Sequence, residues 1–125
     1  MVAEKDTAAI PALLEESVAL GAPPYWDKLS GQALVAHLLG LILATIDNFT
    51  YHREWCHGDE LALEFTGTVG DLHIQGIDLI TLGEDGRVRN LDVLMRPINT
   101  MTALRDIIGP QMVEYFASLE KPATT

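Results

Sequence analysis

The feature that most constrains this fold is an alternation of apolar and polar residues that starts at Phe49 and runs almost to Pro97. A period of two is typical of β-strands with one buried face. Short turn sequences such as Gly70-Asp71 interrupt the alternation, and turns of this kind join antiparallel neighbours. The pattern therefore predicts an antiparallel meander of four strands, at about 49–56, 61–69, 72–82 and 87–97.

The turns also predict which side chains share a face of the sheet, because successive strand residues point to opposite sides. A two-residue turn at Gly70-Asp71 places Leu63 opposite Asp78, and a turn at Asp85-Gly86 places Val93 opposite Asp78 as well. The other residues of this face are apolar. They are Leu61, Phe65, Leu72, Ile74, Ile80, Leu82, Leu91 and Met95.

Asp78 is therefore a carboxyl group on an otherwise apolar face. An unpaired charge there is costly, so the group must be hydrogen-bonded, paired or protonated. One hypothesis is a structural carboxyl group, satisfied by a backbone amide or by His52. The other is a pocket acid, held neutral by apolar walls, that donates a hydrogen bond to a ligand oxygen. A different register would turn Asp78 outward.

The orientation of the first strand depends on the length of the turn at 57–60. A four-residue loop there puts Glu54 and His52 on the face of Asp78, with His52 opposite Phe65. These two residues would then act as a general base or as a hydrogen-bond partner. A loop of another length would instead turn inward the alternate residues Tyr51, Arg53 and Trp55.

Helical periodicity precedes the predicted meander. A short helix carries Ile10, Leu13 and Leu14, and a proline loop leads from it to two aromatic residues, Tyr25 and Trp26, which we expect at the mouth of a pocket. The apolar residues from 31 to 47 recur every three or four positions. They predict a largely buried helix with Ser30 as its N-cap.

Helical periodicity also follows the meander. Asn99 or Thr100 is expected to cap a helix that Gly109-Pro110 breaks, and a second helical piece is expected at about 110–119. The order of helices, four-stranded meander and helices predicts an α+β fold. The 125 residues suit a single domain spanning 1–125.

Composition limits the partners. The formal net charge of −10 disfavours nucleic acid, and no apolar run reaches the roughly 18 residues of a membrane span. The one cysteine, Cys56, argues for a reducing compartment, and we expect a cytoplasmic protein. The four histidines do not have the spacing of metal ligands, so neither a metal nor a cofactor is expected.

Two stretches resemble the nuclear transport factor 2-like superfamily, which includes SnoaL-like and ketosteroid isomerase-like proteins. The first is Gly76-Ile77-Asp78-Leu79-Ile80-Thr81-Leu82, followed by Glu84-Asp85-Gly86-Arg87-Val88. The second is Leu14-Glu15-Glu16-Ser17-Val18, followed by a proline loop and by Ser30-Gly31-Gln32-Ala33 at the start of a helix. Met95-Arg96-Pro97 before a helix is similar to an uncharacterised SnoaL-like subgroup. The resemblance covers residues 8–108.

This resemblance implies a cone-shaped fold in which a curved sheet wraps helices around an apolar pocket, and many members dimerise. Asp78 matches the acid that helps form the oxyanion hole of ketosteroid isomerases. The position of their basic carboxylate is matched by Gly21, and this chain lacks the residues for their long first helix. In limonene epoxide hydrolases, which share the fold, the acid on the last strand falls near Val93. We expect the 100–119 helices or a second copy to cover the sheet.

Two functions remain open. The first is a cofactor-independent isomerase, lyase or hydrolase that acts on an apolar carbonyl or hydroxyl compound, with Asp78, Glu54 and His52 as catalytic residues. The second is a non-catalytic module that binds a small apolar ligand or dimerises, with Asp78 structural. In either case we expect a homodimer and a pocket lined by Tyr25, Trp26, Leu63, Phe65, Val93 and Met95.

Overall fold

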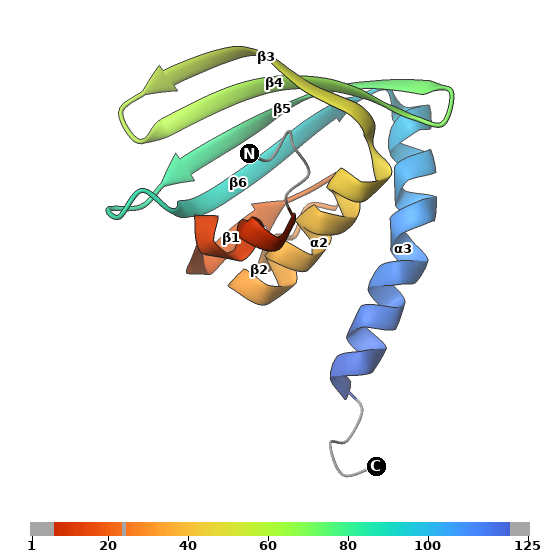
Figure 1. The fold of residues 1–125 in the computed structure, drawn as a ribbon, viewed down its shortest axis with the longest axis horizontal. Coiled ribbons are helices and arrows are strands. Elements are labelled where there is room, and N and C mark those ends of the chain that lie inside the picture. Colours follow the sequence, from red (N-terminus) through yellow and green to blue (C-terminus); the bar gives the residue numbers. More distant parts are fainter. Residues whose placement is uncertain (1–6, 24, 121–125) are drawn as a thin grey trace.

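The structure is a computed structural model that describes residues 7–23 and 25–120. Six strands form one curved sheet in the order β2-β1-β6-β5-β4-β3. Figure 1 shows the sheet curving over α1 and α2, with α3 along one side and extending past the other elements. The strands are β1 (Leu14–Gly21), β2 (Leu29–Ser30), β3 (Asp47–His57), β4 (Glu60–Val69), β5 (Leu72–Leu82) and β6 (Val88–Arg96). The helices are α1 (Ile10–Leu13), α2 (Gln32–Thr45) and α3 (Ile98–Glu120), after a 3-10 turn at Thr7–Ala9.

The predicted meander is present as β3 to β6, and the register of its last three strands is confirmed. Asp78 lies opposite Leu63 on β4 and opposite Val93 on β6. The turn at Gly70-Asp71 is the expected one, because Val69 pairs with Leu72. The concave side of the sheet therefore carries the apolar face on which Asp78 was expected.

Two further strands, β1 and β2, were not predicted. Leu14, which was expected at the end of a helix, is the first residue of β1, and β1 runs parallel to β6. Strand β2 has only two residues and pairs with the end of β1. The sheet is therefore mixed and six-stranded rather than a four-stranded antiparallel meander. The described residues before β1, 7–13, form one short helical segment.

Helix α2 packs under the concave face and buries Val35, Leu38 and Leu43. It begins after Gly31 rather than at a Ser30 cap. Gly31 has φ 107°, a left-handed conformation that glycine adopts without strain, and no side chain caps the helix. The side chain of Gln32 donates to the Pro11 carbonyl at 2.7 Å and to the Leu14 carbonyl at 3.1 Å, which ties α2 to α1 and β1.

Helix α3 is continuous, whereas the sequence predicted a break at Gly109-Pro110. Part of the clash between proline and the preceding residue involves the Cβ atom of that residue, and Gly109 has none. The side chain of Gln111 donates to the Ile107 carbonyl at 3.0 Å, one turn back in the same helix. The expected caps are also wrong, because the helix begins at Ile98. Thr100 is fully buried and its Oγ1 donates to the His73 carbonyl at 2.7 Å.

The core lies between the sheet and the three helices. It includes Ile10 of α1, Val18 and Leu20 of β1, Ile74 of β5 and Leu104 of α3. Helix α3 therefore covers part of the sheet, which is one of the two covers that the sequence predicted. Within residues 7–23 and 25–120, no helix combines the length and the apolar character that crossing a membrane requires.

Candidate functional site

Asp78 lies in the middle of β5 and faces the concave side of the sheet. Its neighbours across the strands are Leu63 and Val93, and its carboxyl group lines a cavity between the sheet and the helices. Leu63 and Val93 are hydrocarbon side chains, which do not stabilise a negative charge as water does. Burial among such residues therefore raises the pKa of the Asp78 carboxyl from 3.8 to about 6.

A β-bulge in β3 decides which residue meets Asp78. Tyr51 pairs with Phe65 and Glu54 pairs with Leu63, so two residues of β3 oppose one residue of β4. The sequence placed His52 opposite Phe65, and this is wrong by one residue. The bulge turns Tyr51 to the concave side while leaving the register near the turn as predicted.

The Tyr51 hydroxyl donates a hydrogen bond to Asp78 Oδ2 at 3.1 Å. This bond opposes the effect of burial on Asp78, because it stabilises the carboxylate. Burial, together with the charge of Asp78, raises the pKa of the Tyr51 hydroxyl, which therefore remains a donor. Tyr51 and Asp78 thus form a polar pair on an apolar wall.

An aromatic cluster holds the Tyr51 ring in place. The Phe49 ring stacks on the Phe65 ring with centroids 4.9 Å apart and meets the Tyr51 ring edge-on at 5.0 Å. Gly76 lies opposite Phe65, and a Cβ atom at Gly76 would collide with the Phe65 ring and with the Leu94 carbonyl. Because Gly76 has no side chain, the Phe65 ring can lie directly against β5, next to the Asp78–Tyr51 pair.

The cavity has a volume of about 1010 Å³, at the upper end of the range for small-molecule sites. Its wall is mainly hydrocarbon and comes from α1, α2, α3, all six strands of the sheet and residues 22, 23 and 25–27. The titratable side chains in the wall are Tyr25, Asp27, Tyr51, Asp78, Arg105 and Asp106. Of the three carboxyl groups among them, Asp27 and Asp106 are exposed, so Asp78 alone lies inside.

The expected lining residues are mostly found in this wall. Tyr25, Trp26, Phe65, Val93 and Met95 line the cavity, whereas Leu63 does not. Tyr25 and Trp26 lie at its opening, since their side chains are 70 % and 94 % exposed.

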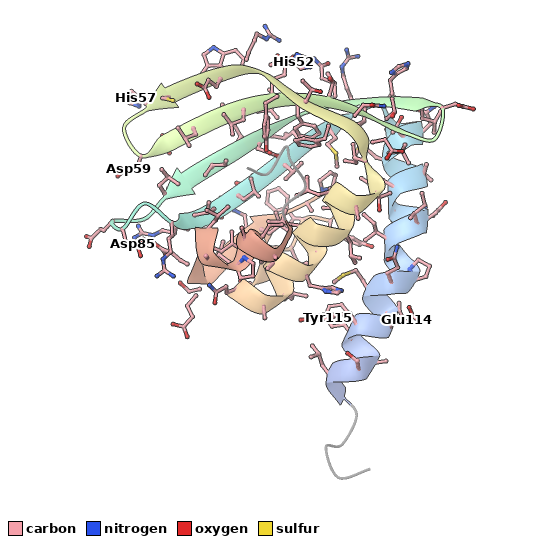
Figure 2. All side chains as sticks on the ribbon, viewed as in Figure 1. His52, His57, Asp59, Asp85, Glu114 and Tyr115 are labelled. Carbon is pink, nitrogen blue, oxygen red and sulfur yellow. The ribbon has the colours of Figure 1, made fainter. Side chains whose placement is uncertain are left out.

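Neither Glu54 nor His52 lines the cavity that contains Asp78. Glu54 is exposed and outside the lining, although its register is the predicted one. His52 lies on the convex side, where its Nε2 is 2.6 Å from Thr66 Oγ1; Figure 2 shows it above the sheet. For His52 the bulge is the reason, because it turns His52 and its neighbour Arg53 to the same side. Glu54 remains on the face of Asp78, opposite Leu63, but lies outside the cavity lining.

The convex side holds a separate polar network. Arg53 makes two hydrogen bonds to Glu64, at 2.6 and 3.0 Å, and Gln75 donates to Glu64 at 2.6 Å. Arg96 donates to Gln75 at 2.7 Å. The hydrogen bond from Arg53 is the main cause that lowers the pKa of Glu64 to about 2. This network explains why Arg53 faces outward at the bulge.

Sequence reasoning missed two parts of the site. Tyr51 appeared only as one of two open orientations, and an irregular strand gives no sequence signal that would fix it. The contribution of α3 to the cavity wall was also missed, because a helical period does not say what the helix faces. Among the described residues, no group of three or more His, Cys, Asp and Glu side chains could hold a metal ion.

Comparison with solved structures places this geometry among known folds. No protein-family model and no curated protein matches the sequence. An uncharacterized protein with a cystatin-like fold from Silicibacter pomeroyi is 39 % identical, with a TM-score of 0.86, and the match covers 90 % of this chain and 80 % of that one. A steroid delta-isomerase from Pseudomonas aeruginosa is 30 % identical, with a TM-score of 0.85, over 93 % and 86 % of the two chains.

A nuclear transport factor 2-like protein of unknown function from Cytophaga hutchinsonii has the same fold, with a TM-score of 0.64. It is 15 % identical, and the match covers 78 % of this chain and 82 % of that one. The curved six-stranded sheet, the helices beneath it and two solved relatives of at least 30 % identity agree with one another. The chain therefore belongs to the nuclear transport factor 2-like superfamily.

Proposed function

We propose that the protein binds an apolar small molecule in the cavity and that Asp78 and Tyr51 contact an oxygen of this ligand. The observation that carries the proposal is the hydrogen bond between the two side chains, 3.1 Å long, on an otherwise apolar stretch of the concave sheet. Apolar pockets with a few convergent polar groups are typical of small-molecule sites.

The protonation state of Asp78 determines which oxygen it prefers. Below a pH of about 6 the carboxyl group is protonated and donates a hydrogen bond to a ligand carbonyl. Above that pH the carboxylate accepts one hydrogen bond from Tyr51 and has a second oxygen for a ligand hydroxyl. The ligand class is therefore an apolar ketone or alcohol.

A second candidate is an isomerase that moves a proton within such a ligand. A carboxyl group with a pKa of about 6 is well suited to proton transfer near neutral pH. Asp78 would take a proton from a carbon next to the carbonyl and return it to another carbon, with no net change in protons. The likeness to a protein described as a steroid delta-isomerase favours this candidate. Leu20 and Ala22, which line the cavity on either side of Gly21, supply no second base.

The test is the pH dependence of binding, measured by calorimetry with a steroid ketone and with the corresponding steroid alcohol. We expect the ketone to bind more tightly at pH 5 than at pH 8 and the alcohol to show the opposite order. Asp78→Asn should abolish both pH dependences and weaken ketone binding about tenfold. Tyr51→Phe should move the midpoint to higher pH, because the Tyr51 hydrogen bond lowers the pKa of Asp78.

His52→Gln is the matched control, because it removes an ionisable side chain that faces the convex side, away from the cavity. Its pH profile should equal that of the wild type. Binding that is independent of pH in the wild type, or that is unchanged by Asp78→Asn, would overturn the role of the pair. Turnover of an unsaturated steroid ketone by the wild type, but not by Asp78→Asn, would indicate an isomerase rather than a protein that only binds the ligand.

We also propose that a second copy of the chain packs on the convex side of the sheet. Trp55, Leu79 and Leu94 face this side from three strands and are 49 %, 41 % and 56 % exposed. Exposed apolar patches of this kind mark interaction sites, and a two-fold interface uses the same patch twice.

We propose a reducing, cytoplasmic compartment for the protein, because its one cysteine, Cys56, is free and exposed.

A further inference from the structure

The surroundings of helix α3 change at the Gly109-Pro110 step. Before this step the helix is docked in the core, because Thr100, Leu104 and Ile108 are 0 %, 5 % and 7 % exposed. After it, none of the described residues 111–119 is buried. Figure 1 shows this second half of α3 extending past the other elements. The packing that fixes the helix therefore ends at the Gly109-Pro110 step.

The same step is where α3 bends most easily. Pro110 has no backbone N–H, so the Asp106 carbonyl one turn back cannot accept the usual helical hydrogen bond from it. Sharp bends in helices occur mostly at proline. A Cβ atom at Gly109 would meet nothing within 4 Å, so the space beside the step is open. These features make the step a hinge between the two halves of α3.

An aromatic contact holds the second half of α3 against α2. The Tyr115 ring stacks on the His37 ring of α2, with centroids 3.9 Å apart and planes 14° apart. Figure 2 shows Tyr115 on the side of α3 that faces α2 and Glu114 away from it. A stacked pair contributes about as much as one hydrogen bond to stability. The stack can therefore open while the core stays folded.

The second half of α3 also closes part of the cavity. Met112, Val113 and Phe116 line the cavity that contains Asp78. Val113 and Phe116 are 68 % and 40 % exposed, so they lie at its opening. A movement of this half away from α2 therefore widens the opening without moving the sheet that carries Asp78.

We propose that residues 110–120 of α3 form a lid over the cavity, with Gly109-Pro110 as its hinge and the His37–Tyr115 stack as its latch. When the stack breaks, the lid swings away from α2 and admits a small molecule, and when the stack re-forms, the opening narrows again. Lids of this kind move on the microsecond to millisecond timescale. The inference concerns access to the cavity and does not depend on which ligand the cavity takes.

The test measures how fast a reagent reaches a thiol inside the cavity. In a Cys56→Ser background, Val93→Cys places the only thiol of the chain on the strand residue opposite Asp78. Its labelling by dithiobis(nitrobenzoic acid) is followed by absorbance. Val18→Cys in the same background reports unfolding, because Val18 is fully buried and does not line the cavity.

The two thiols should differ in rate and in their response to urea. We expect Val93→Cys to be labelled about tenfold faster than Val18→Cys or more, because local opening is more frequent than unfolding. Below the unfolding transition, urea should change the labelling of Val93→Cys little and speed that of Val18→Cys steeply. The reason is that a lid movement exposes less surface than unfolding.

The latch is tested by Tyr115→Ala, which should speed the labelling of Val93→Cys about tenfold. Alanine is the better helix former, so the gain cannot come from a weaker helix. Glu114→Ala is the matched control, since Glu114 is the exposed neighbour on the same half of α3 and faces away from α2. It should leave the rate unchanged.

The hinge is tested by Pro110→Ala, which returns a backbone N–H to the Asp106 carbonyl and should slow the labelling of Val93→Cys about fivefold. An unchanged rate in Pro110→Ala would overturn the hinge. An unchanged rate in Tyr115→Ala would overturn the lid, because the reagent would then enter with the stack intact. Equal labelling of Val93→Cys and Val18→Cys would also overturn it, because the cavity would then open only on unfolding.

Discussion

Asp78 is held in a position that costs stability at neutral pH. Its pKa is about 6 in the native protein against an ordinary value of 3.8, so the native state binds more protons than the unfolded state between these values. Stability therefore falls as the pH rises through this window and stays lower above it. A difference of this size corresponds to about 3 kcal/mol.

Asp78→Asn tests this cost. We expect the variant to be more stable than the wild type by about 1–3 kcal/mol at pH 8 and nearly equal to it at pH 4, because an amide carries no charge to desolvate. Urea unfolding at the two pH values measures the difference. Asp59→Asn, in the exposed turn after β3, should change neither value. Equal destabilisation by Asp78→Asn at both pH values would mean a structural role for the carboxyl group.

At the scale of elements, the strands that depend on short turns were predictable and the irregular ones were not. The turn at Gly70-Asp71 and strict alternation gave the correct partners of Asp78. Strand β3 breaks the alternation, because a bulge turns both His52 and Arg53 outward. At this bulge Arg53 pairs with Glu64 on the neighbouring strand, a contact that a local pattern does not contain.

The continuity of helix α3 and the existence of strand β1 also depend on tertiary contacts that a local sequence pattern does not contain. The Gly109-Pro110 sequence predicted a break because proline removes a helical hydrogen bond, yet α3 continues through it. Tertiary contacts of Leu104 and Ile108 in the core outweigh this local cost. Strand β1 was not predicted beyond Leu14, which was expected in a helix, because Glu15 and Glu16 are poor strand formers and only the pairing with β6 reveals the strand.

Gly76→Ala tests the fit of β5 against the aromatic cluster. The added methyl group would collide with the Phe65 ring and with the Leu94 carbonyl, so we expect a loss of about 1–3 kcal/mol in the free energy of unfolding. Thermal or urea unfolding measures the loss. Thr81→Val, on the same strand but facing the other side, should change stability by less than about 0.5 kcal/mol. If Gly76→Ala were neutral, the close approach of Phe65 to β5 would be wrong.

At the scale of the whole molecule, the sequence predicted the α+β fold and the family resemblance, which agrees with two relatives of at least 30 % identity. The expected lining was found at Phe65, Val93 and Met95, whose faces follow from alternation. The share of α3 in the cavity could not be predicted. Where a helix docks depends on packing between distant segments, such as the stack of Tyr115 on His37.

The proposed dimer is also a property of the whole molecule. We expect the wild type to sediment as a dimer and Leu94→Asp to sediment as a monomer, because a charge in the centre of an apolar interface is desolvated without a partner. Analytical ultracentrifugation measures the mass. Ile107→Asp places the same charge on a residue of similar exposure on α3 and should leave the dimer intact. A monomeric wild type would contradict the proposal.

The central claim is that Asp78 and Tyr51 hold a ligand oxygen inside the cavity. The most direct measurement is the ¹³C chemical shift of dodecan-2-one labelled at its carbonyl carbon and bound to the protein at pH 5. Hydrogen bonding moves a carbonyl resonance downfield, so we predict a downfield shift on binding to the wild type and a smaller one with Asp78→Asn or Tyr51→Phe. A bound carbonyl with the same resonance in all three proteins would contradict the account.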